Sequence, residues 1–129
     1  MAGDVSAMVH QALLGDAWEH ADVAVAIFAD DQRYVACNEA FCRLTGHSRA
    51  EIVRMRVGVD LAVDEQAHRK VVGEIFASKR TTATVDLRRK DGSTVKVNLW
   101  AIETRTAGLP YFIVLHWPVS QRPKRRDIV

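Results

Sequence analysis

The chain has 129 residues, of which 48% are hydrophobic and 26% are charged. This composition predicts one domain with a single core and excludes collagen-like, disordered and disulfide-scaffold proteins. The formal net charge of +2 is too small to indicate nucleic-acid binding. No apolar run approaches the roughly 20 residues of a membrane helix, and the N-terminus lacks the pattern of a secretory signal. We therefore expect a cytoplasmic protein that does not associate with membranes.

The chain divides into a helix, a domain and a tail. Residues 1–21 place apolar side chains at spacings of three to five, which predicts an amphipathic helix. Residues 22–119 carry the alternating strand and helix patterns of one domain. Residues 120–129 form a tail with a basic cluster at Lys124, Arg125 and Arg126. We expect this tail to be solvated rather than bound to a partner.

The first half of the domain predicts a hairpin and short helices. Two extended stretches, 23–29 and 33–36, are separated by a polar cluster typical of a turn. Asn38 is a candidate cap for the helix that follows, and Gly46 a candidate end. Ser48 with a glutamate three residues later has the pattern of a capping box.

The second half predicts one longer helix and three strands. The helix covers 64–78, with acidic residues at its start and basic residues after it. Asp91 and Gly92 then separate two stretches in which apolar and polar residues alternate, and 111–117 forms the last strand. The order predicts an α+β fold, a five-stranded antiparallel sheet with short helices on one face.

The outer face of this sheet needs a cover. The stretches 23–29 and 111–117 are apolar on both faces, so neither face can be left to water. The N-terminal helix would cap this face, or a second copy of the chain would cover it. Alternation places Val97, Leu99 and Ala101 toward the helices and Trp100 outward. The predicted interface of a homodimer therefore consists of Leu13, Trp18, Trp100 and Ile102.

Several segments resemble bacterial PAS domains. The first half carries Asn38-Glu39-Ala40-Phe41, Leu44-Thr45-Gly46 and Ser48-Arg49-Ala50-Glu51-Ile52, and the second half carries Arg88-Arg89-Lys90-Asp91-Gly92-Ser93 between two strands. The resemblance implies a sensory or protein-interaction module that often dimerises through an N-terminal helix. It also implies a small cavity between the long helix and the sheet.

We expect the residues that line such a cavity to come from the inward faces of the long helix and of the strands. This cavity would be apolar and suited to a lipid-like or aromatic ligand, with a plain hydrophobic core as the alternative. The predicted lining residues are His68, Val71, Ile75, Val85, Val97, Leu99, Ile113 and Leu115.

The resemblance also guides the cofactor hypotheses. Light-sensing members bind flavin beside a cysteine in an Asn-Cys-Arg-Phe motif, but the corresponding residues 55–60 contain no cysteine, so a flavin is not expected. Haem-binding members place a histidine on the long helix. His68 lies there and points toward the core, although the family's ligand would fall close to Val63. A haem or other cofactor held by His68 is therefore the alternative hypothesis, and no other metal site is predicted.

The remaining features argue against catalysis. The sequence contains no nucleophile elbow, P-loop, dinucleotide-binding turn or zinc-protease motif, so we do not expect an enzyme. Cys37 and Cys42 are assigned to one short helix, where a spacing of five turns them about 140° apart and predicts two free thiols. If these residues are the whole gene product, we expect it to signal to another protein in trans or through its oligomeric state. If they are a fragment of a larger sensor, the output domain lies outside this sequence.

Overall fold

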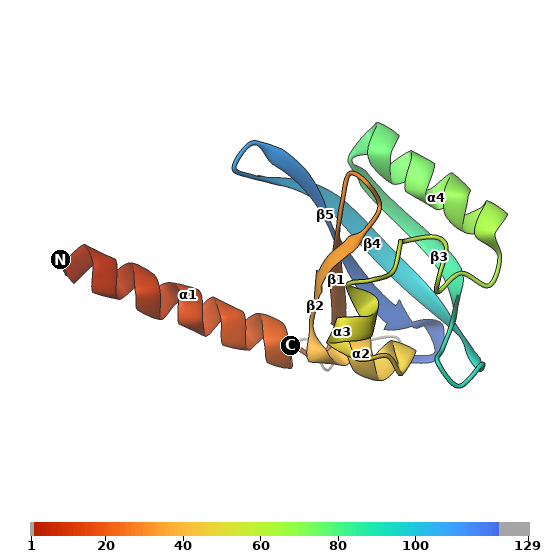
Figure 1. Cartoon of the computed structure of the whole chain (residues 1–129), viewed down its shortest axis with the longest axis horizontal. Helices are drawn as coiled ribbons and strands as arrows, with labels where there is room; N and C mark the ends of the chain where they lie inside the picture. Colours follow the sequence, from red (N-terminus) through yellow and green to blue (C-terminus); the bar gives the residue numbers. More distant parts are fainter. Residues whose placement is uncertain (1, 122–129) are drawn as a thin grey trace.

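A computed structural model describes the backbone of residues 2–121 and the side chains of residues 8–10 and 12–120. Five antiparallel strands form one sheet in the order β2-β1-β5-β4-β3, and α2, α3 and α4 lie on one of its faces (Figure 1). The predicted α+β fold is confirmed. The strands are β1 (Ala24–Ala29), β2 (Tyr34–Cys37), β3 (Arg80–Arg88), β4 (Thr94–Thr106) and β5 (Leu109–Pro118). The helices are α1 (Ala2–His20), α2 (Glu39–Thr45), α3 (Arg49–Ile52), α4 (Glu65–Ser78) and the 3₁₀ turn η1 (Val119–Gln121).

The short helices begin and end at the capping residues that the sequence indicated. Asn38 has extended backbone and its side chain accepts a hydrogen bond from the Phe41 amide at 3.1 Å. Gly46 ends α2 at φ 77°, a left-handed conformation that glycine adopts without the usual steric cost. Ser48 and Glu51 form the predicted capping box at the start of α3. These local signals fix the path of the chain between β2 and α4.

The sheet separates two sets of apolar side chains. Val97, Leu99 and Ala101 are buried on the side of the helices, as predicted. Their neighbours along β4 face the other way, and Trp100 and Ile102 are half-buried there. In the register of the sheet, Trp100 pairs with Leu115 and Ile102 pairs with Ile113. Because directly opposed residues in an antiparallel pair point to the same side, all four belong to the outer face.

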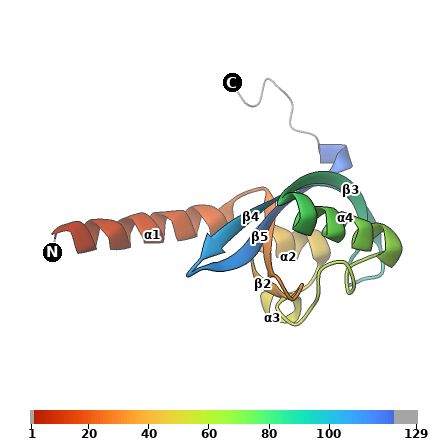
Figure 2. The same ribbon diagram turned by 90° about the horizontal axis from the view of Figure 1, so that it is seen from above.

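The N-terminal helix does not cover this outer face. α1 leaves the domain to one side and contacts it at its C-terminal end, next to α2 (Figures 1 and 2). The side chains of Met8 and Leu13 are 69% and 64% exposed. The helix therefore exists where the sequence predicted it, but the expectation that it caps the sheet within one chain is not met.

Two further predictions concern the basic C-terminal tail and membrane helices. The basic cluster at 124–126 lies outside the described residues. Within residues 2–121, no helix combines the length and the apolar character that crossing a bilayer requires.

Candidate functional site

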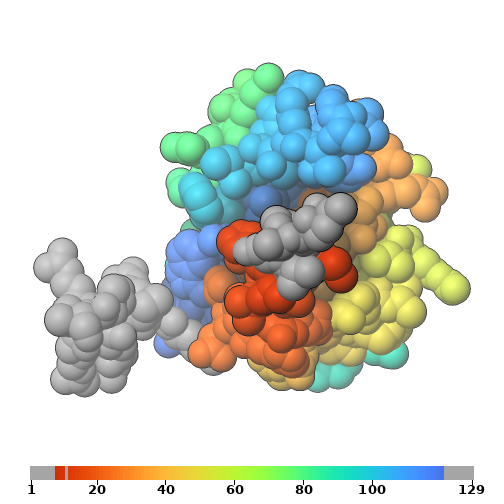
Figure 3. Space-filling model, turned by 90° about the vertical axis from the view of Figure 1, so that its left-hand side faces the viewer, coloured from red at the N-terminus to blue at the C-terminus, as the bar shows by residue number. Residues whose placement is uncertain are grey.

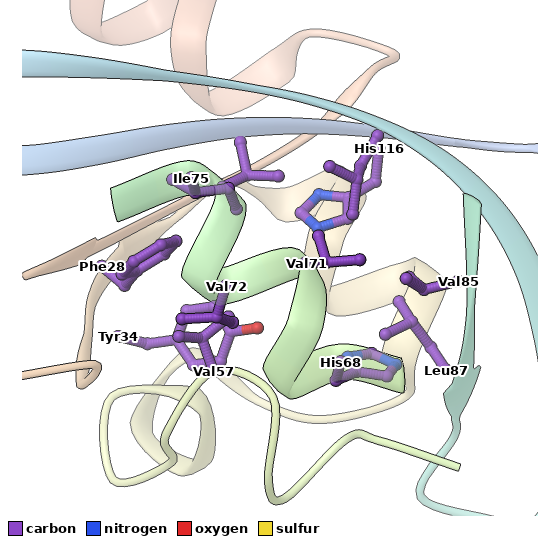
Figure 4. Close-up of a pocket in the computed structure, with 12 residues that line it drawn as sticks. Phe28, Tyr34, Val57, His68, Val71, Val72, Ile75, Val85, Leu87 and His116 are labelled. Atoms are coloured by element: carbon purple, nitrogen blue, oxygen red, sulfur yellow. The ribbon is translucent and has the colours of Figure 1, made fainter. Parts of the chain in front are cut away.

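A small cavity lies between α4 and the inner face of the sheet (Figure 4). Its volume is about 30 Å³, which is room for one water molecule or little more. The cavity occupies the place that the PAS resemblance implied, and its lining is mostly apolar. The lining residues are Phe28, Tyr34, Val57, His68, Val71, Val72, Ile75, Val85, Leu87, Leu99, Val114 and His116.

One face of α4 forms a wall of the cavity. His68, Val72 and Ile75 are buried at spacings of four and three, which keeps them on one side of the helix. The loop before α4 closes over this wall at Gly58, which has φ 78°. A Cβ atom at Gly58 would lie 3.2 Å from Val72 Cγ2, so glycine is what allows the loop to approach the helix this closely.

Five of the eight predicted lining residues do line the cavity: His68, Val71, Ile75, Val85 and Leu99. Val97 is fully buried on the same side of the sheet but belongs to the surrounding core and does not line the cavity.

The placement of Ile113 and Leu115 toward the helices was wrong. Phe112, Val114 and His116 are the buried residues of β5, and Ile113 and Leu115 alternate with them toward the outer face. The strand is apolar on both sides, so alternation by itself could not tell which set faces inward. The register with β4 decides this, because Leu115 pairs with Trp100, which is an outward residue.

The sequence reasoning missed the polar groups of the cavity other than His68. Tyr34, from β2, and His116, from β5, both line it and are 4% and 5% exposed. His116 is two residues after Val114 and four after Phe112, so strand alternation would have placed it in the core once those two were known to face inward. Figure 4 shows the Tyr34 hydroxyl and both imidazoles around the same space.

His68 is held by a backbone carbonyl. Its Nε2 lies 3.0 Å from the carbonyl oxygen of Asp86 on β3. A carbonyl only accepts, so Nε2 must carry the proton and donate it. The nitrogen is therefore committed to a hydrogen bond that ties α4 to β3, and it is not free to bind a metal.

His116 and Tyr34 are neutral at pH 7. Burial lowers the pKa of His116 to about 4, and its Nδ1 donates to the carbonyl oxygen of Ala24 at 3.3 Å. Burial also raises the pKa of Tyr34 above its ordinary value, with the Asp60 carboxylate adding to the shift. Both groups therefore present neutral dipoles rather than charges to the cavity.

The cavity does not fit a large cofactor. Sites for cofactors and drug-sized ligands have volumes of about 300–1,000 Å³, roughly ten or more times the volume of about 30 Å³ found here. Neither haem nor flavin fits the residues as they are packed, and the hydrogen bond of His68 through Nε2 leaves only its Nδ1 for binding a metal. Among the described residues, no group of three or more potential ligands could hold a metal ion.

The four predicted interface residues fall in two places. Leu13 is exposed on α1, whereas Trp18 is half-buried where α1 joins the domain. Trp100 and Ile102 lie together on the outer face of the sheet, next to Leu115. The structure thus places both sets away from the cavity, on the opposite side of the sheet or beyond the domain.

The fold and the cavity agree with the comparison to known families. A family model described as "PAS domain" matches residues 22–116. The chain belongs to the PAS domain family. The resemblance carried by the motifs around Asn38 and Asp91 is therefore confirmed. No curated protein sequence matches it significantly.

Solved PAS domains share its fold at low sequence identity. One from a two-component sensor histidine kinase has a TM-score of 0.73 and 20% identity, over 90% of this chain and 98% of that one. The PAS domain of an HTR-like protein from Haloarcula marismortui has a TM-score of 0.78 and 15% identity, over 92% and 98%. An RNA-binding light-oxygen-voltage receptor has a TM-score of 0.75 and 23% identity, over 87% and 34%.

Proposed function

We propose that this PAS domain is a non-catalytic sensory module that acts as a homodimer through α1 and the outer face of the sheet. The observation that carries the proposal is the set of large apolar side chains on these two surfaces that the single chain leaves partly or wholly uncovered. A signalling protein bound in trans to the same surfaces is the alternative occupant. The PAS domain of a sensor histidine kinase, which has the same fold, supports the sensory role.

The first surface is α1 itself. Met8, Val9, Leu13 and Leu14 are 53–69% exposed on a helix that projects from the domain. Val9 and Leu13 are four residues apart and so lie one above the other on the helix. Figure 3 views the molecule from the side on which α1 projects, so that α1 stands in front of the domain, with β4 and β5 above it. A second copy would remove these side chains from water, which favours association.

The second surface is the outer face of the sheet. Trp100, Ile102, Ile113 and Leu115 form two directly paired positions on neighbouring strands, and all four are half-buried. Tryptophan is enriched at the centres of protein interfaces, where a single truncation often weakens binding strongly. This cluster is therefore the part of the surface most sensitive to mutation.

The sheet connects the cavity to this surface. Along β4, Leu99 lines the cavity and the next residue, Trp100, faces outward. The same alternation holds on β5, where Val114 lines the cavity and Leu115 faces outward. Because successive side chains of a strand share one backbone, a shift of the strand at the cavity also moves the outer face. This arrangement supports a signal that passes from the core to the dimer interface.

The test is the oligomeric state of Trp100→Glu, measured by sedimentation velocity at several protein concentrations. We expect the wild type to sediment as a dimer and Trp100→Glu to shift toward monomer, because a carboxylate at the centre of an apolar contact loses its hydration. Leu13→Glu tests α1 in the same way. Val59→Glu is the matched control, since Val59 is 45% exposed and belongs to the loop between α3 and α4, outside both surfaces. A wild type that is monomeric at all concentrations would contradict the proposal.

A ligand in the cavity is a second candidate function, favoured by the three polar groups that face it. As packed, the cavity takes an occupant of about the size of water, and a larger ligand requires α4 to move. Native mass spectrometry of freshly purified protein, with its absorption spectrum, tests this candidate. The bare polypeptide mass would support an interaction module, colourless extra mass would reveal a small metabolite, and a Soret band would restore the haem hypothesis for His68.

A further inference from the structure

The two cysteines are in contact. Cys37 and Cys42 are five residues apart, yet their Sγ atoms lie 3.7 Å from each other. The prediction that they point apart was wrong because it placed both in one helix. Cys37 is the last residue of β2, and the helix begins only after the cap Asn38. With Asn38 as the N-cap, Cys37 and Cys42 occupy the positions before the cap and four residues into the helix, which pack together at many helix starts.

The two thiols differ in their access to solvent. Cys37 is 2% exposed, whereas Cys42 is half-buried. Burial and the neighbouring Cys42 thiol raise the pKa of Cys37 to about 12. At neutral pH Cys37 is therefore a protonated thiol shielded from solvent, and a dissolved oxidant reaches Cys42 first.

We propose that Cys37 and Cys42 form a redox-active dithiol that a peroxide closes to an intramolecular disulfide. The Cys42 thiolate attacks one peroxide oxygen, the O–O bond breaks, and a sulfenic acid forms with release of hydroxide or alkoxide. The Cys37 sulfur then attacks the Cys42 sulfur, the S–O bond breaks, and the S–S bond forms. The thiol proton of Cys37 leaves with the hydroxyl group as water. Two electrons pass from the dithiol to the peroxide.

The geometry requires a small closure. The two Sγ atoms must approach from 3.7 Å to about 2.05 Å, the length of a disulfide bond. Cys37 ends a strand and Cys42 lies within a helix, so side-chain rotation is combined with a shift where β2 meets α2.

This junction is also where α1 is attached. Asn38, next to Cys37, donates from Nδ2 to the carbonyl oxygen of Trp18 at 3.0 Å. Arg49 donates from Nε to the carbonyl oxygen of Cys37 at 3.3 Å and from Nη2 to the Glu19 carboxylate. Two of the links between the last turn of α1 and the domain thus run through Cys37 or its neighbour. A third, between His20 Nδ1 and Glu39 Oε2 at 3.4 Å, lies one residue further along the chain. The disulfide therefore changes how α1 is held.

The first experiment treats the full-length chain with hydrogen peroxide and measures the intact mass and the non-reduced peptide map. The chain contains only two cysteines, so Cys42→Ser and Cys37→Ser are complete controls. We expect the wild type to lose two hydrogen masses, to show a Cys37–Cys42 linkage and to recover with dithiothreitol. Cys37→Ser should instead trap a sulfenic acid at Cys42 that dimedone labels. Overoxidation of Cys42, an intermolecular disulfide or an unchanged mass in the wild type would overturn the proposal.

The second experiment compares hydrogen exchange in the reduced and oxidised forms. We expect the oxidised form to exchange several-fold faster than the reduced form at two places. These are the last turn of α1 and the Phe41 amide, which donates to the Asn38 side chain. The turn at 89–93 is the internal control and should exchange equally in both forms. Equal exchange at the α1 junction would overturn the link between the disulfide and α1.

Discussion

Asn38 joins three segments through its side chain. Its Oδ1 accepts from the amides of Val25 and Phe41, at 2.9 and 3.1 Å. Its Nδ2 donates to the carbonyl oxygens of Trp18 and Val23, at 3.0 and 2.9 Å. The side chain is fully buried and all of its hydrogen-bonding capacity is used. A residue that the sequence marks only as a helix cap thus also holds β1 and the end of α1.

Replacing Asn38 should therefore cost more than removing an ordinary cap. Asn38→Ala leaves two amides and two carbonyls without their partner, and we expect a loss of about 3 kcal/mol in the free energy of unfolding. Urea denaturation measures this loss. Ser48→Ala is the control, because Ser48 is an exposed cap whose loss costs about 1 kcal/mol. Equal losses in the two variants would show that Asn38 acts as a cap alone.

His116 should make the domain sensitive to acid. The pKa of His116 is about 4 in the folded chain and about 6.5 in an unfolded chain. Since the unfolded state binds the proton more tightly, the contribution of His116 is present above pH 6.5 and is lost as pH falls toward 4. The shift corresponds to about 3 kcal/mol.

The measurement compares the wild type with His116→Gln, which retains a donor for the Ala24 carbonyl but does not titrate. The difference in their free energies of unfolding should fall by about 3 kcal/mol between pH 7 and pH 4. Carboxylates with lowered pKa values, such as Glu51 and Asp91, act in both proteins and cancel in the difference. A difference that does not change with pH would contradict the neutral, buried assignment of His116.

Among the elements, α4 ends in a strained conformation. Lys79 caps it with φ 62°, a left-handed backbone that favours glycine, and its amide donates to the Ile75 carbonyl at 2.8 Å. The Lys79 side chain is 63% exposed, so its pairing with Glu103 contributes little. The cap therefore makes the hydrogen bond that normally ends a helix, but places a lysine in a backbone conformation that glycine adopts at lower steric cost.

We expect Lys79→Gly to stabilise the domain by about 0.5–1 kcal/mol, since glycine removes the steric cost of the left-handed backbone. Thermal unfolding at constant pH measures the change. Ser78→Gly is the neighbouring control and should destabilise by a similar amount, because residue 78 is still within the helix. If both substitutions destabilise equally, the backbone at Lys79 is not strained.

The element that sequence reasoning read least well is β5. In the first part of β4, at 94–99, polar residues alternate with apolar ones, and the inward set of Val97, Leu99 and Ala101 was predicted correctly. In β5 the residues on both faces are mostly apolar, so alternation could not tell the faces apart. Ile113 and Leu115 were therefore assigned to the inner face, although they lie on the outer one. The predicted set was also inconsistent with the sheet, because Leu115 and Trp100 are direct partners. Register, which depends on the neighbouring strand, was the missing information.

At the scale of the whole molecule, the sheet is the boundary between two kinds of surface. Its inner face holds a cavity with neutral polar groups, and its outer face holds paired aromatic and aliphatic side chains. α1 projects beyond both, attached at the junction of Asn38 and Arg49 (Figure 2). The proposed dimer and the proposed disulfide act on this same attachment, one through the outer surface of α1 and one through its base.

The sequence by itself determined the order of elements, their capping residues and the family. Caps at Asn38, Gly46 and Ser48 depend on residues within a few positions, so local chemistry is enough to place them. The period of alternation along β4 is equally local. Tertiary structure alone decided which face of β5 points inward, that His116 and Tyr34 meet His68 at one cavity, and that α1 leaves the sheet uncovered. Each of these depends on strand register or on packing between segments distant in sequence, and no local pattern encodes them.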